Sequence, residues 1–341
     1  MTKAGRGRFF EDYRLGETME HAVPRTLSGG ERALYHALYP ARHALHSSDE
    51  FARLCGLAAS PLDDLLVFHT VFGRSVPDVS LNAAANLGYA EGRFLRPVAP
   101  GETLRASSEV IGLRAASSGE AGIVWVRTTG VSRGEPVLRF VRWALVRKRD
   151  PGAPDPEAHV PELAAAVRPE DLRVPEALEF ARYDFALAGE PHRLHDYAVG
   201  EVIDHVDAVT VEEAEHMLAT RLWQNTARVH FDAGARADGR RLVYGGHVMS
   251  LARALSFAGL ANAQFVAAIN GGTHANPCFA GDTVRAWSEV LDVAETRAPG
   301  VGAIRLRTVA TTGAAGALRG ADGRHLPEVL LDLDYWALMP V

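Results

Sequence analysis

The chain has 341 residues, 47% hydrophobic and 23% charged, which is typical of a folded globular protein and excludes a disordered or fibrous one. At roughly 150 residues per domain, this length predicts about two domains, each large enough to bury its own core. Lys and Arg number 36 against 42 Asp and Glu, and the resulting net charge of −6 provides no basic excess to attract nucleic acid or an anionic membrane.

Neither end of the chain nor its cysteines point to secretion or to a membrane. The N-terminal residues 1–16 are basic but lack the apolar stretch of a signal peptide, and the most apolar 20-residue window, 250–269, still contains Arg253. Cys55 and Cys278 lie far apart and form no paired-thiol motif, so neither a disulfide framework nor a thiolate zinc site is indicated. We therefore expect a cytoplasmic protein.

Several segments of the first half of the chain recur in the second half in the same order, which is the signature of an internal repeat. The matches are FEDYRLGE at 10–17 with LHDYAVGE at 194–201, PVAPGETL at 97–104 with PCFAGDTV at 277–284, 109–111 with 289–291, and 143–145 with 336–338. We interpret them as two copies of one domain, 1–150 and 194–341. Because residues 151–191 hold seven of the 18 prolines, 151–193 is predicted to be a linker that wraps over the surface.

Each copy shows the same order of predicted elements: an opening strand, a helical region, a second and stronger helix, and then several strands. In the second copy, residues 247–261 repeat apolar side chains at helical spacing from Val248 to Ala258, which predicts one long helix. Its first-copy counterpart is 61–73.

The last strands of the second copy alternate apolar and polar residues. Segments 304–312 and 330–339 do so, and in the second one Trp336 shares a face with Asp332 and Asp334. Half-buried antiparallel strands are therefore expected. The fold class is α+β, with a long helix packed on a curved antiparallel sheet in each copy and the two sheets able to join edge to edge.

The most informative stretch is QNTARVHFDAG at 224–234, followed closely by YGGHVMS. It resembles the MaoC-like, or (R)-specific enoyl-CoA hydratase, branch of the hot dog fold, whose signature Asp-x-Asn-Pro-x-His-x-Asp precedes a glycine that opens the central helix. His230 and Asp232 fall on the His-x-Asp, and Gly246 falls on the glycine. Applied to both copies, the resemblance implies a double hot dog.

Longer segments, 38–54, 61–97 and 224–231, are similar to one subfamily, the mesaconyl-CoA (2-methylfumaryl-CoA) hydratases, also called β-methylmalyl-CoA dehydratases. This resemblance implies reversible addition of water to the double bond of 2-methylfumaryl-CoA, which gives β-methylmalyl-CoA. Coenzyme A would then be part of the substrate, and no separate cofactor is expected.

Hydration of an unsaturated thioester requires a group that activates water, a proton donor for the α carbon, and donors to the thioester oxygen. His230 is the acid/base candidate, because an imidazole can both take and return a proton near neutral pH. The helix that begins at Gly245 and Gly246 can present backbone amides to the oxygen. The residues predicted to bind substrate are Tyr244, Gly245, His247, Arg228, His46 and Arg74.

The chain departs from the family signature at its catalytic Asp, which maps onto Asn225 in the second copy and Ala41 in the first. An amide can hold water but cannot accept its proton. His230 must then transfer protons nearly alone, or Asp232 or the repeat partner His46 must assist. We expect the first copy to be degenerate and the chain to have one active site.

Arginine is the expected partner of the substrate's free carboxylate, and Arg228, Arg74 and Arg42 are the candidates. For the CoA phosphates the candidates are Arg93, Arg96, Arg147 and Lys148, which the sequence does not rank. The sequence has no metal-ligand spacing, phosphate loop, dinucleotide motif or serine-hydrolase elbow, so no metal is expected.

Three alternatives remain open at this stage: another (R)-specific enoyl-CoA hydratase, an acyl-CoA thioesterase on the same fold, and a non-catalytic acyl-CoA binding protein. The expected assembly is a homodimer or a pseudo-dimeric monomer, because two hot dog copies already lie within one chain.

Overall fold

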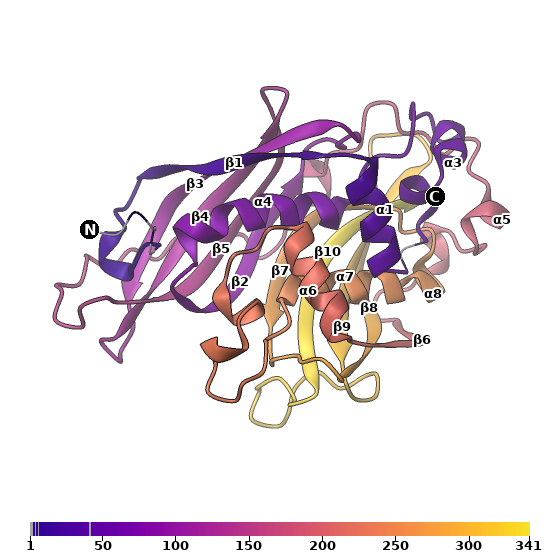
Figure 1. The fold of residues 1–341 in the computed structure, drawn as a ribbon. Coiled ribbons are helices and arrows are strands. Elements are labelled where there is room, and N and C mark those ends of the chain that lie inside the picture. Colours follow the sequence, from indigo (N-terminus) through magenta and orange to yellow (C-terminus); the bar gives the residue numbers. More distant parts are fainter. Residues whose placement is uncertain (1–2, 4, 6, 41) are drawn as a thin grey trace.

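The computed structural model describes residues 3, 5, 7–40 and 42–341, so Ala41 lies outside the described residues. The described strands form one antiparallel sheet, and the longer helices pack on one of its faces (Figure 1). The strands are β1 Thr18–Leu27, β2 Ala83–Phe94, β3 Glu102–Ala115, β4 Ala121–Ser132, β5 Glu135–Arg147, β6 Val202–Thr210, β7 Phe265–His274, β8 Thr283–Glu295, β9 Val301–Thr311 and β10 Val329–Pro340.

The sheet consists of two halves with the same internal strand order. The full order is β1-β3-β4-β5-β2-β7-β10-β9-β8-β6, so the halves join where β2 pairs with β7. At this join, Tyr89 lies opposite Gly272 and Arg93 opposite Ala268. The predicted edge-to-edge union of two antiparallel sheets is therefore confirmed, and it covers one edge of each half.

The helical elements repeat between the halves as well. The α-helices are α1 Gly29–Leu38, α2 Ala44–Ser47, α3 Asp49–Leu54, α4 Asp64–Val79, α5 Phe185–Ala188, α6 Glu213–Leu222, α7 Gly245–Leu255 and α8 Phe257–Leu260; the 3-10 turns are η1 Phe10–Asp12, η2 Pro169–Asp171, η3 Leu194–Asp196, η4 Arg228–His230 and η5 Ala233–Ala235. Helices α4 and α7 are almost completely buried, because the sheet covers one side of each and the shorter helices cover the other. No helix in the described part of the chain is long and apolar enough to cross a membrane.

The predicted single long helix of the second copy is wrong in its last turn. Helix α7 ends at Leu255, and Ala258 and Gly259 have non-helical backbone angles, with φ of +92° at Gly259. The side chain of Glu190 accepts hydrogen bonds from the amides of Gly259 and Ala261, while His205 binds the carbonyl of Ala258. These tertiary contacts replace helical hydrogen bonds, so apolar spacing alone overestimates the helix.

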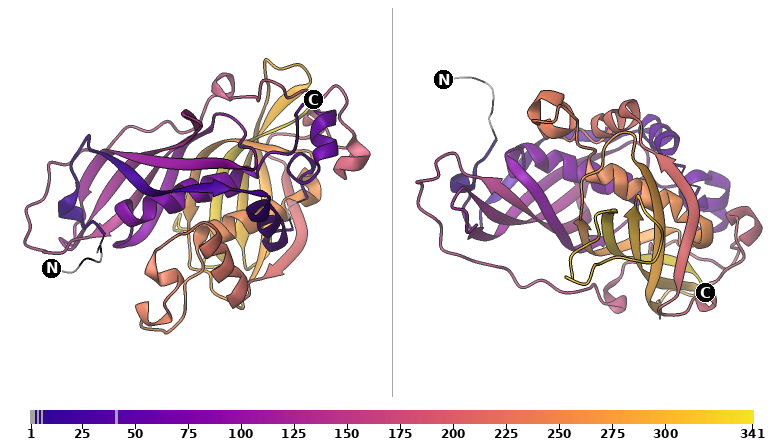
Figure 2. Two further views of the ribbon diagram at one scale, coloured as in Figure 1. Left: turned by 45° about the horizontal axis from the view of Figure 1, so that its top comes forward. Right: turned by 90° about the horizontal axis from the view of Figure 1, so that it is seen from below.

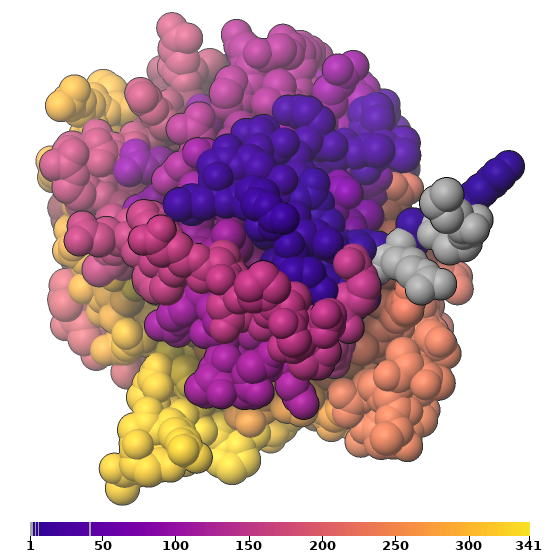
Figure 3. All heavy atoms as spheres, turned by 90° about the vertical axis from the view of Figure 1, so that its left-hand side faces the viewer, coloured from indigo at the N-terminus to yellow at the C-terminus, as the bar shows by residue number. Residues whose placement is uncertain are grey.

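Residues 151–193 pack against the sheet through Val167 and against α3 and α8 through later residues such as Tyr183 and Glu190, and the prediction that Trp336 lies on a half-exposed face is wrong. Trp336 is only 1% exposed, and its indole nitrogen donates to the carbonyl of Val167 at 2.9 Å. The same apolar cluster contains Phe180 and Tyr183. Figure 2 shows this segment running from one half to the other, and in Figure 3 its pink atoms lie beside the indigo N-terminal segment.

Candidate active site

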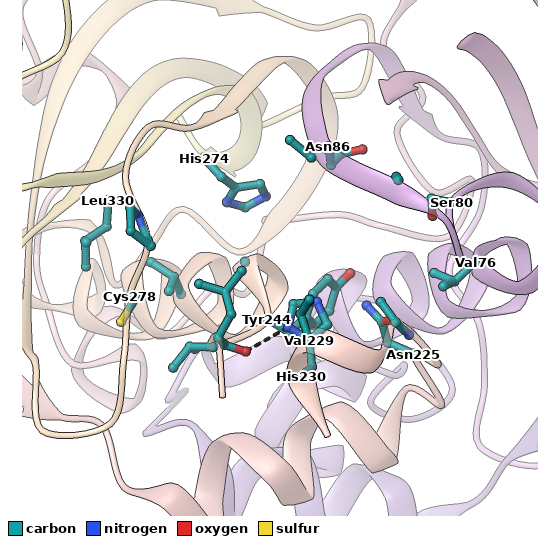
Figure 4. A pocket seen from close by; sticks show the side chains of 18 of the residues that line it. Val76, Ser80, Asn86, Asn225, Val229, His230, Tyr244, His274, Cys278 and Leu330 are labelled. Carbon is teal, nitrogen blue, oxygen red and sulfur yellow. Dashed lines mark hydrogen bonds between the residues drawn. The ribbon is translucent and has the colours of Figure 1, made fainter. Parts of the chain in front are cut away.

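A cavity of about 380 Å³ lies where the two halves of the sheet meet, and both copies form its wall. The first copy contributes the second half of α4 and the start of β2, and the second contributes the loop before α7, the first turn of α7 and the end of β7 (Figure 4). The polar residues of the wall are Ser80, Asn86, Tyr89, Asn225, His230, Tyr244, His274 and Asn276.

His230 presents a free imidazole nitrogen in this wall. Its Nδ1 lies 2.8 Å from the carbonyl oxygen of Leu242, which can only accept, so Nδ1 carries the hydrogen and Nε2 keeps its lone pair (Figure 4). Burial lowers the pKa of His230 to about 4, although the bond to Leu242 acts in the opposite direction. The imidazole is therefore neutral at neutral pH and can accept a proton.

Asn225, five residues before His230, also lines the cavity. Its Oδ1 accepts the amide hydrogen of Ala227 at 3.0 Å, which leaves the amide group as a donor, and the side chain is hydrogen-bonded to the hydroxyl of Tyr244. Asn225 is 2% exposed and held on both sides. An amide in this position can bind and orient a small polar molecule beside His230.

Helix α7 begins with two glycines, of which Gly245 lines the cavity and Gly246, predicted to be catalytic, does not. Tyr244 is the N-cap and Gly245 the first helical residue. A Cβ on Gly245 would lie 2.5 Å from Nδ1 of His274, and one on Gly246 would lie 2.7 Å from the ring of His69. The first amides of a helix lack intrahelical partners and sit at the positive end of its dipole, so they are suited to hold a carbonyl oxygen that gains negative charge.

His274 is a residue of the candidate site that the sequence did not predict. It ends β7 and faces the cavity, with Nε2 3.0 Å from the hydroxyl of Tyr89 across the β2–β7 join. Burial lowers its pKa to about 4. The sequence feature that could have identified His274 is its position three residues before the repeated turn at 277–284.

Asp232 and four of the predicted substrate-binding residues, Arg228, His247, Arg74 and His46, do not line the cavity. Asp232 is exposed and caps η5 by accepting the amide of Gly234, and Arg228 is exposed on η4, because that short turn directs Arg228 outward and His230 inward. His247 lies one-half turn from Gly245 and bonds to Tyr39 instead. Arg74 donates to the backbone carbonyl of Val23 and, more weakly, to that of Trp223.

The arginines considered for the substrate carboxylate and for CoA are also engaged elsewhere. Arg42 lies over the ring of Phe257 at 4.3 Å. Arg93 faces Asp171 of the linker at 3.7 Å, and Arg96 forms a two-pronged ion pair with Glu102. None of the three lines the cavity.

In the first copy, the position equivalent to the substrate site is occupied by the chain itself. Helix α4 begins at Asp64 where α7 begins at Gly245, and the Asp64 carboxylate accepts from the amide of Val266 and lies 3.4 Å from Nε2 of His46. This carboxylate raises the pKa of the buried His46. His46 therefore faces an internal anion, and the adjoining space, partly lined by Arg173 of the linker, measures only about 20 Å³.

The buried neutral histidines predict a steep loss of stability in acid. Burial lowers the pKa of His205, His230 and His274 to about 4 and that of His247 to about 3. As pH falls below 6.5 the unfolded chain binds protons that the folded chain binds only near pH 4, so the free energy of unfolding declines across this window. Each residue contributes up to about 3 kcal/mol. Urea unfolding between pH 7 and pH 4 measures the decline; a constant midpoint over this range would contradict it.

The fold and this cavity define the class: the chain is a double hot dog protein with one open site between its two copies. A Mycobacterium tuberculosis protein described as having a double hot dog fold superimposes with a TM-score of 0.73 at 27% identity, over 97% of this chain and 98% of that one.

Sequence comparison gives the particular family. The family model for mesaconyl-CoA hydratase matches residues 2–316. The chain is 70% identical to a mesaconyl-CoA hydratase of Cereibacter sphaeroides, covering 99% of each, and 55% identical to a beta-methylmalyl-CoA dehydratase of Chloroflexus aurantiacus, covering 99% of this chain and 98% of that one. The chain belongs to the mesaconyl-CoA hydratase family.

Proposed function

We propose that the protein catalyses the reversible hydration of 2-methylfumaryl-CoA (mesaconyl-CoA) to β-methylmalyl-CoA. The observation that carries this proposal is the neutral imidazole of His230, which offers an unprotonated Nε2 to the same cavity that receives the glycine-rich start of α7. The two relatives named above, a hydratase and a dehydratase for the two directions of one reaction, support it.

In the proposed mechanism, the thioester oxygen of the substrate accepts hydrogen bonds from the first amides of α7. Asn225 holds a water molecule, His230 Nε2 removes its proton, and the water oxygen bonds to carbon 3 of the acyl group. The electron pair of the double bond moves to the thioester as an enolate, and the imidazolium returns the proton to carbon 2. Asp232 and His46 do not line the cavity, so neither assists.

This division of roles predicts different outcomes for two changes at Asn225. Asn225→Ala removes the group that orients water and is expected to lower kcat about 10- to 100-fold. Asn225→Asp keeps an acceptor and restores the family's usual residue, so it should stay within about 10-fold of the parent. Steady-state kinetics of both variants measure the difference. Equal losses in the two would show that Asn225 only holds the loop.

The function itself is tested by following the absorbance of the enoyl-thioester conjugation after mixing 2-methylfumaryl-CoA with the protein, while free thiol is titrated in the same cuvette. Loss of conjugation without thiol is the expected result, with crotonyl-CoA as the comparison substrate. Release of thiol would instead indicate a thioesterase. Tight binding of the thioester with neither signal would indicate an acyl-CoA binding protein.

The proposal needs no second chain to complete the site, because both walls of the cavity come from one chain. We therefore propose a pseudo-dimer that is active as a unit, whether or not such units pair further.

Cys55 and Cys278 are both buried free thiols, which supports the proposed cytoplasmic location. Arg93 and Arg96, proposed for the CoA phosphates, form ion pairs with Asp171 and Glu102, with which a phosphate would compete.

A further inference from the structure

Arg142 is a buried cation for which the described residues provide no carboxylate within ion-pair distance. It points from β5 toward α4, where its guanidinium lies 4.3 Å above the ring of Phe72. Its two terminal nitrogens donate to Ser80 at 3.1 Å and Ser75 at 2.8 Å, and its Nε has no partner. Burial lowers its pKa only to about 10, so it remains charged at neutral pH. An unpaired buried charge is costly, so this one requires an explanation.

The charge lies directly behind the wall of the cavity. Phe72 and Ser80, which it touches, both line the cavity. Because the oxygen of Ser80 accepts from the guanidinium, the hydroxyl hydrogen of Ser80 is available to donate to a group inside the cavity. Arg142 thus acts on the cavity through Ser80.

Asn86 of β2 adds a second donor at the same end of the cavity. Both polar atoms of its side chain are buried without a hydrogen-bond partner, although the residue lines the cavity (Figure 4). A buried amide without partners costs stability unless a ligand satisfies it. No Asp, Glu, Lys or Arg lies among the described residues that line the cavity, so Arg142 behind Ser80 supplies the positive charge at this end.

We propose that Ser80, Asn86 and Arg142 form the subsite for the free carboxylate of the acyl group. Ser80 and Asn86 donate hydrogen bonds to the carboxylate, and the guanidinium compensates its charge through Ser80. The inference rests on the proposed function for the identity of the substrate. It explains how the site distinguishes an acyl group whose four-carbon chain ends in a carboxylate from one whose chain ends in a methyl group. Arginine is the residue type expected to bind the substrate carboxylate, but Arg142 lies behind the cavity wall and acts through Ser80.

Binding of two saturated thioesters tests the subsite without turnover: succinyl-CoA, which ends in a carboxylate, and butyryl-CoA, which has the same length without it. By titration calorimetry, we expect the parent to bind succinyl-CoA at least 10-fold more tightly. Ser80→Ala and Arg142→Met should each reduce this preference to below 3-fold and leave butyryl-CoA binding within 3-fold. Thr70→Ala, which removes a buried hydroxyl of α4 bonded only to Leu66, is the matched control and should keep the preference.

Each result has a defined meaning. A parent without preference, or a preference that survives in Ser80→Ala, would overturn the subsite. Equal weakening of both thioesters would also overturn it, because it would show that Arg142 only stabilises the end of α4. If Arg142→Met does not fold, Ser80→Ala and Asn86→Ala carry the test. If the parent prefers succinyl-CoA to butyryl-CoA as expected but does not hydrate 2-methylfumaryl-CoA, the proposed function is refuted while the carboxylate subsite stands.

Discussion

Replacing His230 by alanine is expected to lower kcat for hydration by two to four orders of magnitude, the usual contribution of a positioned acid/base group. In the proposed mechanism the imidazole is both the acceptor of the proton from water and the donor that returns it to carbon 2. The described lining of the cavity contains no carboxylate to take over this task. His274 is the other imidazole in the wall, and its bond to Tyr89 directs it to the opposite strand. Stopped-flow absorbance of the enoyl thioester measures the loss.

A matched control lies in the first turn of α7. His247 is as deeply buried as His230 but faces Tyr39 rather than the cavity. His247→Ala should therefore lower the thermal stability while kcat of the folded protein stays within about threefold. Retention of a tenth or more of kcat in His230→Ala, or an equal loss in both variants, would remove His230 from the mechanism.

A Gly245→Ala substitution is expected to have the second-largest effect, a loss of kcat of about 10²-fold, comparable to the loss of one donor to the developing oxyanion. The added methyl group would lie 2.5 Å from Nδ1 of His274 and on the wall where the thioester must approach the helix. Either the imidazole or the start of α7 must move. Because the amides then point away from the thioester oxygen, kcat should fall more than substrate affinity does.

Gly29→Ala is the control for this change. Gly29 is likewise the first residue of a helix, α1, and a Cβ there meets nothing within 4 Å. Its substitution should leave both stability and kcat unchanged within experimental error. If Gly245→Ala behaved in the same way, the helix start would have no part in binding the thioester.

Much of the fold could be predicted from the sequence, because its main features are local or repeated. The collinear repeat predicted two equivalent halves, and the alternation in 304–312 predicted β9. The two errors both arise from tertiary contacts. Glu190 interrupts the helix at Gly259, and the linker buries Trp336, yet neither contact leaves a periodic signal in the sequence.

The candidate site was predictable only where a motif places its residues close together. His230, Asn225 and the glycines of α7 lie within about twenty residues of one another, and all but Gly246 line the cavity. Arg142 and His274, by contrast, come from strands of different copies, and only the β2–β7 join places His274 in the wall of the cavity and Arg142 behind that wall. Arginine was expected for the carboxylate, but sequence alone could not distinguish Arg142 from exposed arginines such as Arg228.

The central claim is that each chain has one acyl-CoA site, between the two copies at His230 and the start of α7, because Asp64 and the linker fill the equivalent position at His46. The most direct test is the number of succinyl-CoA molecules bound per chain at saturation, measured by equilibrium dialysis with the His230→Ala protein. We predict one molecule per chain. Two molecules per chain would show that the His46 site also binds, and no binding would refute the assignment of the cavity to an acyl-CoA.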